Sequence, residues 1–282
     1  MSNVILDTFN KTIGRRFKSS IQTYKKNIAL LSGTVFVSMV SFSSSVAIAT
    51  PNQTQTLRTS ANSVAYHPPS YPSAEEQIDY FLEIAMGSEY GNASSRIRKW
   101  DSDLYIHVQG DPTAQDLTSL QTIVTELNGL IDTVDLHILD DSPRSRRRAN
   151  VTMHFVPVTE FSQHVPEYHP GNLGYAWVWW QDNTIYDATI LISTDNVTQQ
   201  ERTHLIREEL TQSLGLLQDS FRYEDSIFFQ QWTSTAAYSD LDQAIIKMLY
   251  HPAIEPGMSR RRVLNTLNDY PELIASRSTP GQ

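Results

Sequence analysis

Residues 201–219 read ERTHLIREELTQSLGLLQD and have the periodicity of an amphipathic helix, which we expect over about residues 198–216. At 100° per residue the leucines and isoleucine share one arc of this helix, and Glu209 falls inside that arc. Glu208 and Gln212 lie together on the flank of the arc, one turn apart. A carboxylate aimed into an apolar face is costly to ionise, so it needs a partner or a chemical role. The pattern therefore singles out Glu209.

The spacing matches the helix of zinc peptidases, which reads H-E-x-x-H-x-x-G. In that helix two histidines one turn apart bind zinc, and the glutamate beside the first is the general base. Here Glu209 and Gly215 keep the places of the glutamate and the glycine, whereas Glu208 and Gln212 replace the histidines. We therefore predict Glu209 as the catalytic residue. The candidate metal ligands are Glu208, Gln212 and Asp219, the last lying one residue beyond the position of the common third ligand.

Two interpretations of the ligand positions stay open. Carboxylate and amide oxygens are poor zinc ligands, but Glu208 and Gln212 suit calcium, magnesium or manganese, and His204 can join them from one turn earlier. In the alternative no metal binds: Glu208 and Gln212 make hydrogen bonds within the fold, and Asp219 caps a turn. The residue types favour this second interpretation slightly over a bound transition metal.

The sequence around this helix resembles a known family. Residues 207–220 read REELTQSLGLLQDS and are followed by DSIF at 225–228, LYHP at 249–252 and PGMS at 256–259. These segments together resemble domain of unknown function 2927, an uncharacterised family of exported bacterial proteins that is held to be zincin-like. The resemblance covers about residues 185–260 and extends over 73–180 by the order of elements. It implies a zincin-like fold with E-E-x-x-Q in place of H-E-x-x-H, and it implies no function.

The remaining pattern predicts an α+β (or α/β) layer fold: a zincin-like mixed β-sheet with a long site helix and a helical C-terminal part, in one domain over 74–282. Ser73 is expected to cap the first helix, with Glu75 and Glu76 in its first turn. Further helices are expected at 112–131 and 239–250, with a shorter one after Pro256. Strands are expected at 104–108, 134–139, 151–156, 173–180 and 184–193, the last two joined by a turn at 181–183.

An aromatic stripe marks the strand expected at 173–180. Alternation places Tyr175, Trp177 and Trp179 on one face of this strand. Most such stripes belong to a core. The alternative is that these three residues line a substrate cleft for a peptide or a glycan. We also expect Glu209 to lie buried at the floor of a groove beside this strand.

The N-terminal 49 residues have the pattern of a secretory signal peptide. Lys25 and Lys26 precede an uncharged run over 28–41, and residues 46–49 end in an A-x-A pattern, so cleavage is expected after Ala49. An uncleaved anchor over 28–49 is the alternative, although its serine-rich second half disfavours it. A Pro/Ser/Thr-rich linker follows at 50–73. The protein is therefore expected to be exported, periplasmic or secreted, with no membrane span after cleavage.

Composition excludes several classes of protein. The chain is 40% hydrophobic and 10% aromatic, which excludes a disordered protein, and it has no cysteine for a disulfide or thiolate-metal site. Its net charge is −9 overall and −14 without the first 49 residues, so nucleic acid is not an expected partner. The arginines within 144–148 are expected in a solvated loop, with an anion contact as the functional alternative.

These observations leave two main functions and leave catalysis open. The first is an exported cell-envelope protein that is a divergent metallohydrolase or peptidase with Glu209 as general base. The second is an inactive zincin-fold protein that binds a peptide or glycan in the cleft, or acts as a scaffold. A weaker third is a two-carboxylate glycosidase that pairs Glu209 with Glu224 or Asp225. A divalent metal and no cofactor at all both remain open.

Overall fold

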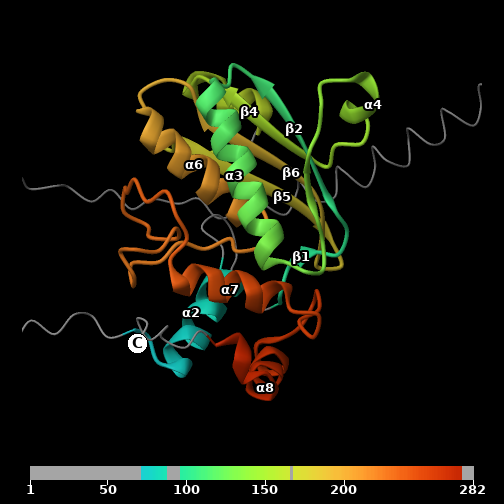
Figure 1. Ribbon diagram of the computed structural model, residues 1–282, viewed down its shortest axis with the longest axis vertical. Helices are drawn as coiled ribbons and strands as arrows, with labels where there is room; N and C mark the ends of the chain where they lie inside the picture. Colours follow the sequence, from blue (N-terminus) through green and yellow to red (C-terminus); the bar gives the residue numbers. More distant parts are fainter. Residues whose placement is uncertain (1–70, 88–95, 166–167, 275–282) are drawn as a thin grey trace, which may run out of the picture. The chain divides into compact units, whose positions relative to one another are not determined.

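A computed structural model describes residues 71–87, 96–165 and 168–274, all within the compact unit Ala65–Gln282 (Figure 1). The expected signal peptide at 1–49 and residues 50–70 of the expected linker lie outside the described residues. None of the described helices is both long and apolar enough to cross a bilayer.

The described residues form a mixed sheet with helices, as the sequence predicts. The strands are β1 (Lys99–Trp100), β2 (Leu104–Gly110), β3 (Leu136–Ile138), β4 (Val151–Val156), β5 (Gly174–Gln181) and β6 (Thr184–Ser193). The α-helices are α2 (Ala74–Met86), α3 (Ala114–Leu130), α4 (Pro143–Arg146), α5 (Phe161–His164), α6 (Gln199–Gln212), α7 (Asp240–Tyr250) and α8 (Arg260–Asp269), with short 3-10 helices at Val158–Glu160 and Pro271–Leu273.

Within these residues the sheet order is β1-β6-β4-β2-β3, and every pair on this path is parallel. Strand β5 is the exception, because it pairs antiparallel with β6 and with no other described strand. The two are joined by the two-residue turn Asp182–Asn183, whose φ angles of 51° and 71° suit a tight hairpin turn. This arrangement leaves β5 at the edge of the sheet.

Helices α3 and α6 pack against each other, and α6 packs against β5 and β6, so these helices cover one face of the sheet (Figure 1). Helices α2, α7 and α8 form the helical part beside it, with α2 packed against the other two. A continuous apolar core joins both parts and includes Phe81, Ile190, Leu210 and Ile245. The indole of Trp100 is fully buried in this core and donates to the carbonyl of Ser213, 2.9 Å away.

Local signals account for where most helices begin. Capping boxes start α2, α3, α6 and α7, and their N-cap residues are Ser73, Thr113, Thr198 and Ser239. In each box the N-cap side chain accepts a hydrogen bond from the N3 amide, and the acidic side chain at N3 accepts one from the N-cap amide. These interactions satisfy amides that the first helical turn leaves unpaired.

The ends of other elements differ from the expectation. Helix α6 ends at Gln212 instead of about residue 216, because Gly215, with φ 113°, turns the chain away and its Cα lies against the Arg98 carbonyl. The arginine-rich segment expected as a loop contains α4, which Ser142 caps and Pro143 begins. Its four arginines are exposed, as a solvated segment should be. Helix α5 was not predicted, since four residues give no readable periodicity.

Candidate functional site

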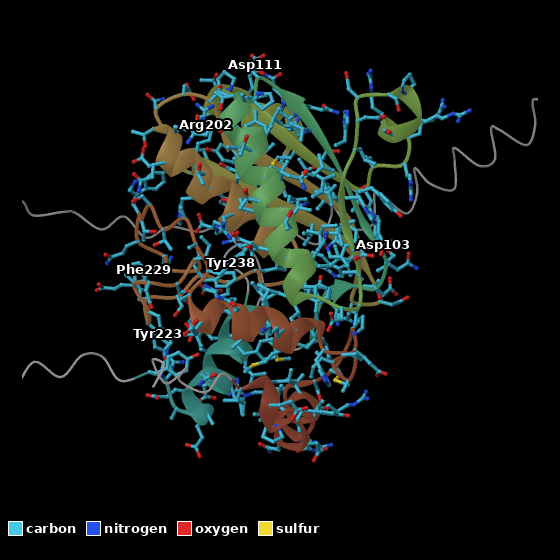
Figure 2. The ribbon with its side chains drawn as sticks, in the orientation of Figure 1. Asp103, Asp111, Arg202, Tyr223, Phe229 and Tyr238 are labelled. Carbon is cyan, nitrogen blue, oxygen red and sulfur yellow. The ribbon has the colours of Figure 1, made fainter. Side chains whose placement is uncertain are left out.

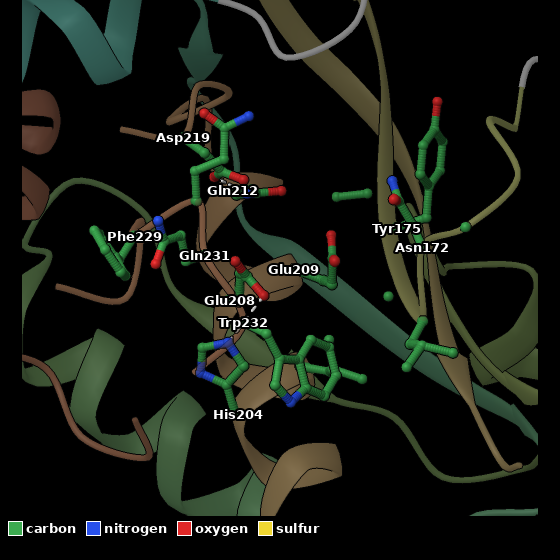
Figure 3. A pocket seen from close by; sticks show the side chains of 16 residues that line it. Asn172, Tyr175, His204, Glu208, Glu209, Gln212, Asp219, Phe229, Gln231 and Trp232 are labelled. Carbon is green, nitrogen blue, oxygen red and sulfur yellow. Dashed lines mark hydrogen bonds and ion pairs between the residues drawn. The ribbon is translucent and has the colours of Figure 1, made fainter. Parts of the chain in front are cut away.

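Helix α6 and the chain that follows it bring the predicted catalytic and metal-binding residues into one pocket of about 190 Å³ (Figure 3). The pocket lies between α6, the first residues of β5, and the chain that follows α6. Its lining comprises Gly171, Asn172, Leu173, Gly174, Tyr175, Ala176, His204, Leu205, Glu208, Glu209, Gln212, Asp219, Phe229, Gln230, Gln231 and Trp232. All the predicted catalytic and metal-binding residues are therefore close together, although Asp219 belongs to a different segment from the helix.

Glu209 is 6% exposed and lies in this pocket beside the start of β5, where a groove-floor residue was expected. The backbone of β5 passes so closely that a Cβ at Gly174 would collide with Oε1 of Glu209 and crowd Leu205. A side chain at this position would therefore displace the side chains of Glu209 and Leu205. Figure 3 shows the Glu209 carboxylate pointing from the helix towards the strand.

Glu208 pairs with His204, which is one turn earlier on the same helix. The His204 Nε2 lies 3.2 Å from Oε2 of Glu208, and its Nδ1–H donates to the Thr235 carbonyl at 2.8 Å. Burial alone would lower the pKa of His204, but the hydrogen bond and charge of Glu208, with the Thr235 carbonyl, raise the pKa overall. When His204 is protonated, its two nitrogens donate to Glu208 and to the Thr235 carbonyl, and the ring neutralises part of the charge of Glu208.

Gln212 pairs with Asp219, which follows the Gly215 turn. The amide Nε2 of Gln212 donates to Oδ1 of Asp219 over 2.7 Å. The turn at Gly215 brings Asp219 to Gln212, because it folds the chain after α6 back beside the last helical turn. At 7% exposure Gln212 is buried, so the hydrogen bond is needed to satisfy its amide.

The donor set of this pocket fits a metal ion poorly. The residues at the two histidine positions are each hydrogen-bonded to a protein partner, Glu208 to His204 and Gln212 to Asp219. Over the described ranges, three histidine or carboxylate ligand atoms lie within 4.8 Å of one another only at Asp103, Asp135 and His137. The described histidine and carboxylates of the pocket form no such group.

The Asp103 group is remote from the pocket and has a structural explanation. Figure 2 places Asp103 on the opposite side of the molecule from Phe229, which lines the pocket. Asp103 Oδ1 accepts from the amide of Asp135 at 3.0 Å, which holds the starts of β2 and β3 together. Asp135 and His137 are exposed.

The aromatic stripe lies on the face of the sheet opposite to α6. Tyr175 is buried in a second apolar cluster with Phe161, Val165 and Leu191, and Trp177 packs against this cluster. The ring of Trp179 contacts that of Trp177, with centroids 6.5 Å apart. Gly174, Ala176 and Val178 instead face the helix.

Of the three residues predicted to line a cleft, the pocket therefore includes Tyr175 but neither Trp177 nor Trp179. The alternation of side chains along β5 correctly predicted that Tyr175, Trp177 and Trp179 share one face. It could not predict which face of β5 helix α6 covers. The expected cleft wall is made by the opposite residues, Gly174 and Ala176. Trp177 and Trp179 are half-buried outside it.

Two carboxylates proposed from the sequence lie outside the pocket, and some residues that line the pocket were not predicted. Glu224 and Asp225 are exposed and do not line the pocket, which removes the carboxylate pairing that a glycosidase would need. Gly174 and the pocket segment 229–232 were not predicted as site residues. The glycine had a readable signal, since glycine within a strand often marks a close approach of another group. The segment 229–232 had none.

The comparisons with known proteins give one family and weak structural likenesses. The family model described as "Protein of unknown function (DUF2927)" matches residues 74–269. A search of curated proteins finds no match. Among solved structures, "Structure of Myroilysin" is similar at 10% identity and a TM-score of 0.36, covering 55% of this chain and 82% of that one. "Crystal structure of myroilysin" is similar at 10% identity and a TM-score of 0.29, covering 75% and 80%.

Proposed function

This chain belongs to the DUF2927 family of proteins of unknown function, and we propose that it is an exported peptide-binding protein that does not hydrolyse its ligand. In this proposal the pocket is the site that a zinc peptidase would use, with its metal-binding positions converted to internal hydrogen bonds. The family membership supplies no activity, so the proposal depends on the geometry of the site.

One observation carries the proposal. The residues that replace the two histidines are satisfied within the protein, by the pairs His204–Glu208 and Gln212–Asp219. A metal ion would have to break both pairs before it gained ligands, and the carboxylate and amide oxygens that it gained are poor for zinc. The site is therefore better suited to binding than to metal-assisted hydrolysis.

The edge position of β5 supports a peptide as the ligand. Within the described residues β5 pairs on one side only, with β6, so its other side can accept an extended peptide by strand addition. Alternate side chains of such a peptide point to the same face. The pocket at Gly174–Ala176 is placed to receive one of them.

Export is the second part of the proposal. It is supported by the basic leader, the uncharged run over 28–41 and the A-x-A ending before Thr50. A cell-envelope location would expose the pocket to envelope peptides. N-terminal sequencing of the secreted or periplasmic protein tests this part: a start near Thr50 supports it, and a retained segment 28–49 in membranes contradicts it.

A divergent metallohydrolase with Glu209 as general base is the second candidate. The observation that favours it is the burial of Glu209 in the pocket beside β5, within reach of a ligand on that strand. It ranks second because the donor set fits a metal ion poorly.

One experiment separates the two candidates. The exported form is incubated with a randomised peptide pool, alone and with zinc, calcium or manganese, and both binding and cleavage products are measured by mass spectrometry. Binding without cleavage under all conditions is the expected result. Cleavage that Glu209→Gln abolishes would establish the hydrolase instead. Failure of every peptide to bind would remove the peptide-binding proposal.

A further inference from the structure

Two histidines lie ring against ring on the face of the sheet opposite to α6. His154 is on β4 and His164 ends α5, and their ring centroids are 4.0 Å apart. Both side chains are half-buried. Apart from this ring contact, neither imidazole makes a hydrogen bond or an ion pair with another described residue. Neutral rings can pack in this way, whereas two protonated rings at the same distance repel each other.

The titratable groups around His154 do not offset a positive charge on it. On the neighbouring strand β2, Nε2 of His107 lies 3.3 Å from Oδ1 of Asp141, and a charge on His107 opposes one on His154. Glu160 precedes His164 by four residues but forms no ion pair with it. Burial, followed by the charges of His164 and His107, lowers the pKa of His154 from 6.5 to about 4. A proton on His154 is therefore unfavourable while α5 is in place.

Helix α5 and the residue after it are held on the sheet by two fully buried side chains. These are Phe161 and Val165, which belong to the second apolar cluster with Tyr175 and Leu191. The Val165 amide also donates to the Phe161 carbonyl at 3.0 Å. A segment with so few buried apolar contacts opens at a small cost in free energy. A change of charge at His154 is therefore enough to alter how often α5 leaves the sheet.

The same cluster supports one wall of the pocket. The ring of Tyr168 contacts those of Phe161 and Tyr175, with centroids 5.2 and 5.5 Å away. The Tyr168 hydroxyl donates to the carbonyl of Asn172 at 2.9 Å. Asn172 and Tyr175 line the pocket, and Figure 3 shows both on its strand side. Loss of Phe161 from the cluster would therefore remove support from this wall.

The chain before α5 has an anchor that persists when His154 is protonated. Oδ1 of Asp195 accepts a hydrogen bond from the Val158 amide at 3.1 Å. Hydrogen bonds from Val158 and Ser193 lower the pKa of Asp195, so its carboxylate stays charged where His154 begins to bind protons. Movement of α5 can therefore take place beyond Val158 without loss of the contact to β6.

We propose that α5 is an acid-sensitive support of the pocket: protonation of His154 and His164 releases α5 from the sheet and loosens the wall at Asn172. The loss of peptide affinity that follows rests on the proposed peptide-binding function, whereas the release of α5 does not. Between pH 6.5 and pH 4 the released form binds a proton at His154 that the packed form does not. Release therefore becomes more favourable as the pH falls across this window.

Hydrogen exchange of the Val165 amide, followed by NMR and corrected for intrinsic exchange, measures the release. Its opening equilibrium should increase about 100-fold between pH 7 and pH 4, because the pKa of His154 is 6.5 when released and about 4 when packed. The buried residue Val124 inside α3 is the reference, and its amide should show no such increase.

Three variants assign the release to the histidine pair. His154→Gln removes the titrating ring and should abolish most of the increase at Val165. His164→Gln removes only the opposing charge, so its increase should be smaller than that of the parent and larger than that of His154→Gln. His137→Gln is the matched control at an exposed histidine on β3 and should behave as the parent. Thermal unfolding at pH 7 detects any loss of folding, and if His154→Gln does not fold, the comparison with His164→Gln decides.

Fluorescence anisotropy with a randomised peptide pool measures the effect on the pocket. The parent should lose more affinity between pH 7 and pH 4 than His154→Gln does. This comparison cancels the titration of the pocket carboxylates, which both proteins share.

The outcomes separate the release from the peptide-binding function. An opening equilibrium at Val165 that does not rise in acid, or that rises equally in His154→Gln, overturns the proposal. Release that depends on His154, with equal loss of affinity in parent and variant, overturns the support of the pocket by α5. Release that depends on His154, without binding of any peptide at either pH, supports the acid-sensitive release and overturns the peptide-binding function.

Discussion

The missing side chain of Gly174 provides the space that the carboxylate of Glu209 occupies. A Cβ on Gly174 would collide with Oε1 of Glu209, so strand β5 and helix α6 meet at this point with backbone against carboxylate. The absence of a Cβ at Gly174 thus leaves room for the Glu209 carboxylate in the pocket.

Gly174→Ala should therefore displace Glu209 and damage the pocket. We expect a loss of stability of about 1–3 kcal/mol, the usual cost of an extra methyl group in a packed position. Peptide affinity should fall together with it, because the carboxylate must move. Urea unfolding and anisotropy measure the two effects. A variant with unchanged stability and affinity would show that the strand and the helix do not approach so closely.

Gly129→Ala is the matched control and a prediction in its own right. Gly129 lies inside α3, and a Cβ there meets no atom within 4 Å. Alanine should stabilise the protein by about 0.5–1 kcal/mol, because it restricts the unfolded chain and favours the helix. Peptide binding should not change. A loss of stability in urea unfolding would contradict the helical assignment of this residue.

The double change Glu208→His and Gln212→His should restore zinc binding if α6 is derived from a zinc peptidase helix. It places two imidazoles one turn apart, with Asp219, now within hydrogen-bond distance of residue 212, as a candidate third ligand. Zinc at about 100 times its dissociation constant would stabilise the variant by about 2.7 kcal/mol. Adding Glu209→Gln should leave zinc affinity nearly unchanged, because Glu209 is not one of these ligands.

Calorimetric titration and thermal unfolding with and without zinc measure this gain. The single variant Glu208→His is the control, since one imidazole with Asp219 should bind zinc more weakly than two. If the double variant gains no zinc-dependent stabilisation over the parent, residues 208 and 212 do not occupy ligand positions. The relationship of this helix to that of zinc peptidases would then be wrong.

The buried ion pair between Asp116 and Arg202 should be a main contributor to the packing of α3 on α6. The Arg202 guanidinium lies 3.0 Å from Oδ2 of Asp116, which is fully buried, and Figure 2 shows Arg202 near the start of α6. Asp116→Ala or Arg202→Ala should each cost about 3–5 kcal/mol, because the remaining charge stays buried without its partner.

A double-mutant cycle tests this prediction. The double variant should cost clearly less than the two single costs together, because it leaves no uncompensated charge. The exposed pair Arg260–Asp79, at 3.0 Å, is the control, and Arg260→Ala should cost about 0–1 kcal/mol. Additive losses at Asp116 and Arg202 would show that the two charges do not interact.

Lys99 should make stability increase with pH above about 8. Its Nζ is buried and donates to the carbonyls of Leu249 and Ile254, at 2.8 and 3.0 Å. Desolvation lowers the pKa of Lys99 from 10.5 to about 8. Between pH 8 and pH 10.5 the unfolded chain binds the proton and the folded protein does not. The free energy of unfolding therefore rises with pH across this window, and it falls as the pH is lowered towards 8.

Comparison with Lys99→Met isolates this effect from other titrations. The stability of the parent relative to the variant should rise by about 2 kcal/mol between pH 8 and pH 10, measured by urea unfolding at each pH. A constant difference over that range would show that Lys99 keeps its ordinary pKa in the folded protein.

The sequence alone was sufficient to predict the features that depend on interactions between residues close together in the chain. Ser73 and Ser239 could be assigned to helix starts because a capping residue interacts with amides only three positions away. The β5–β6 hairpin was readable for the same reason, as its turn involves two adjacent residues. Local geometry also placed Glu208, Glu209 and Gln212 correctly relative to one another, since helix spacing fixes their directions.

Tertiary structure decided which partners those side chains meet. Periodicity placed Glu209 on the buried arc, but only the packing of β5 on α6 shows that Gly174 makes room for it. Alternation put Tyr175 and Trp177 on one face of the strand, yet α6 covers the opposite face, so Trp177 does not line the pocket although Tyr175 does. Both faces of β5 carry apolar side chains, such as Trp177 and Val178, so alternation could not choose between them.

The helix repeat is enough to place Glu208 and Gln212 one turn apart, at the positions of the zinc ligands in a zinc peptidase helix. Only the folded chain decided what they do there. The turn at Gly215 brings Asp219 to Gln212, and the segment that carries Thr235 returns to hold His204 against Glu208. These partners lie far along the chain or beyond a turn, and their positions depend on the packing of the whole domain.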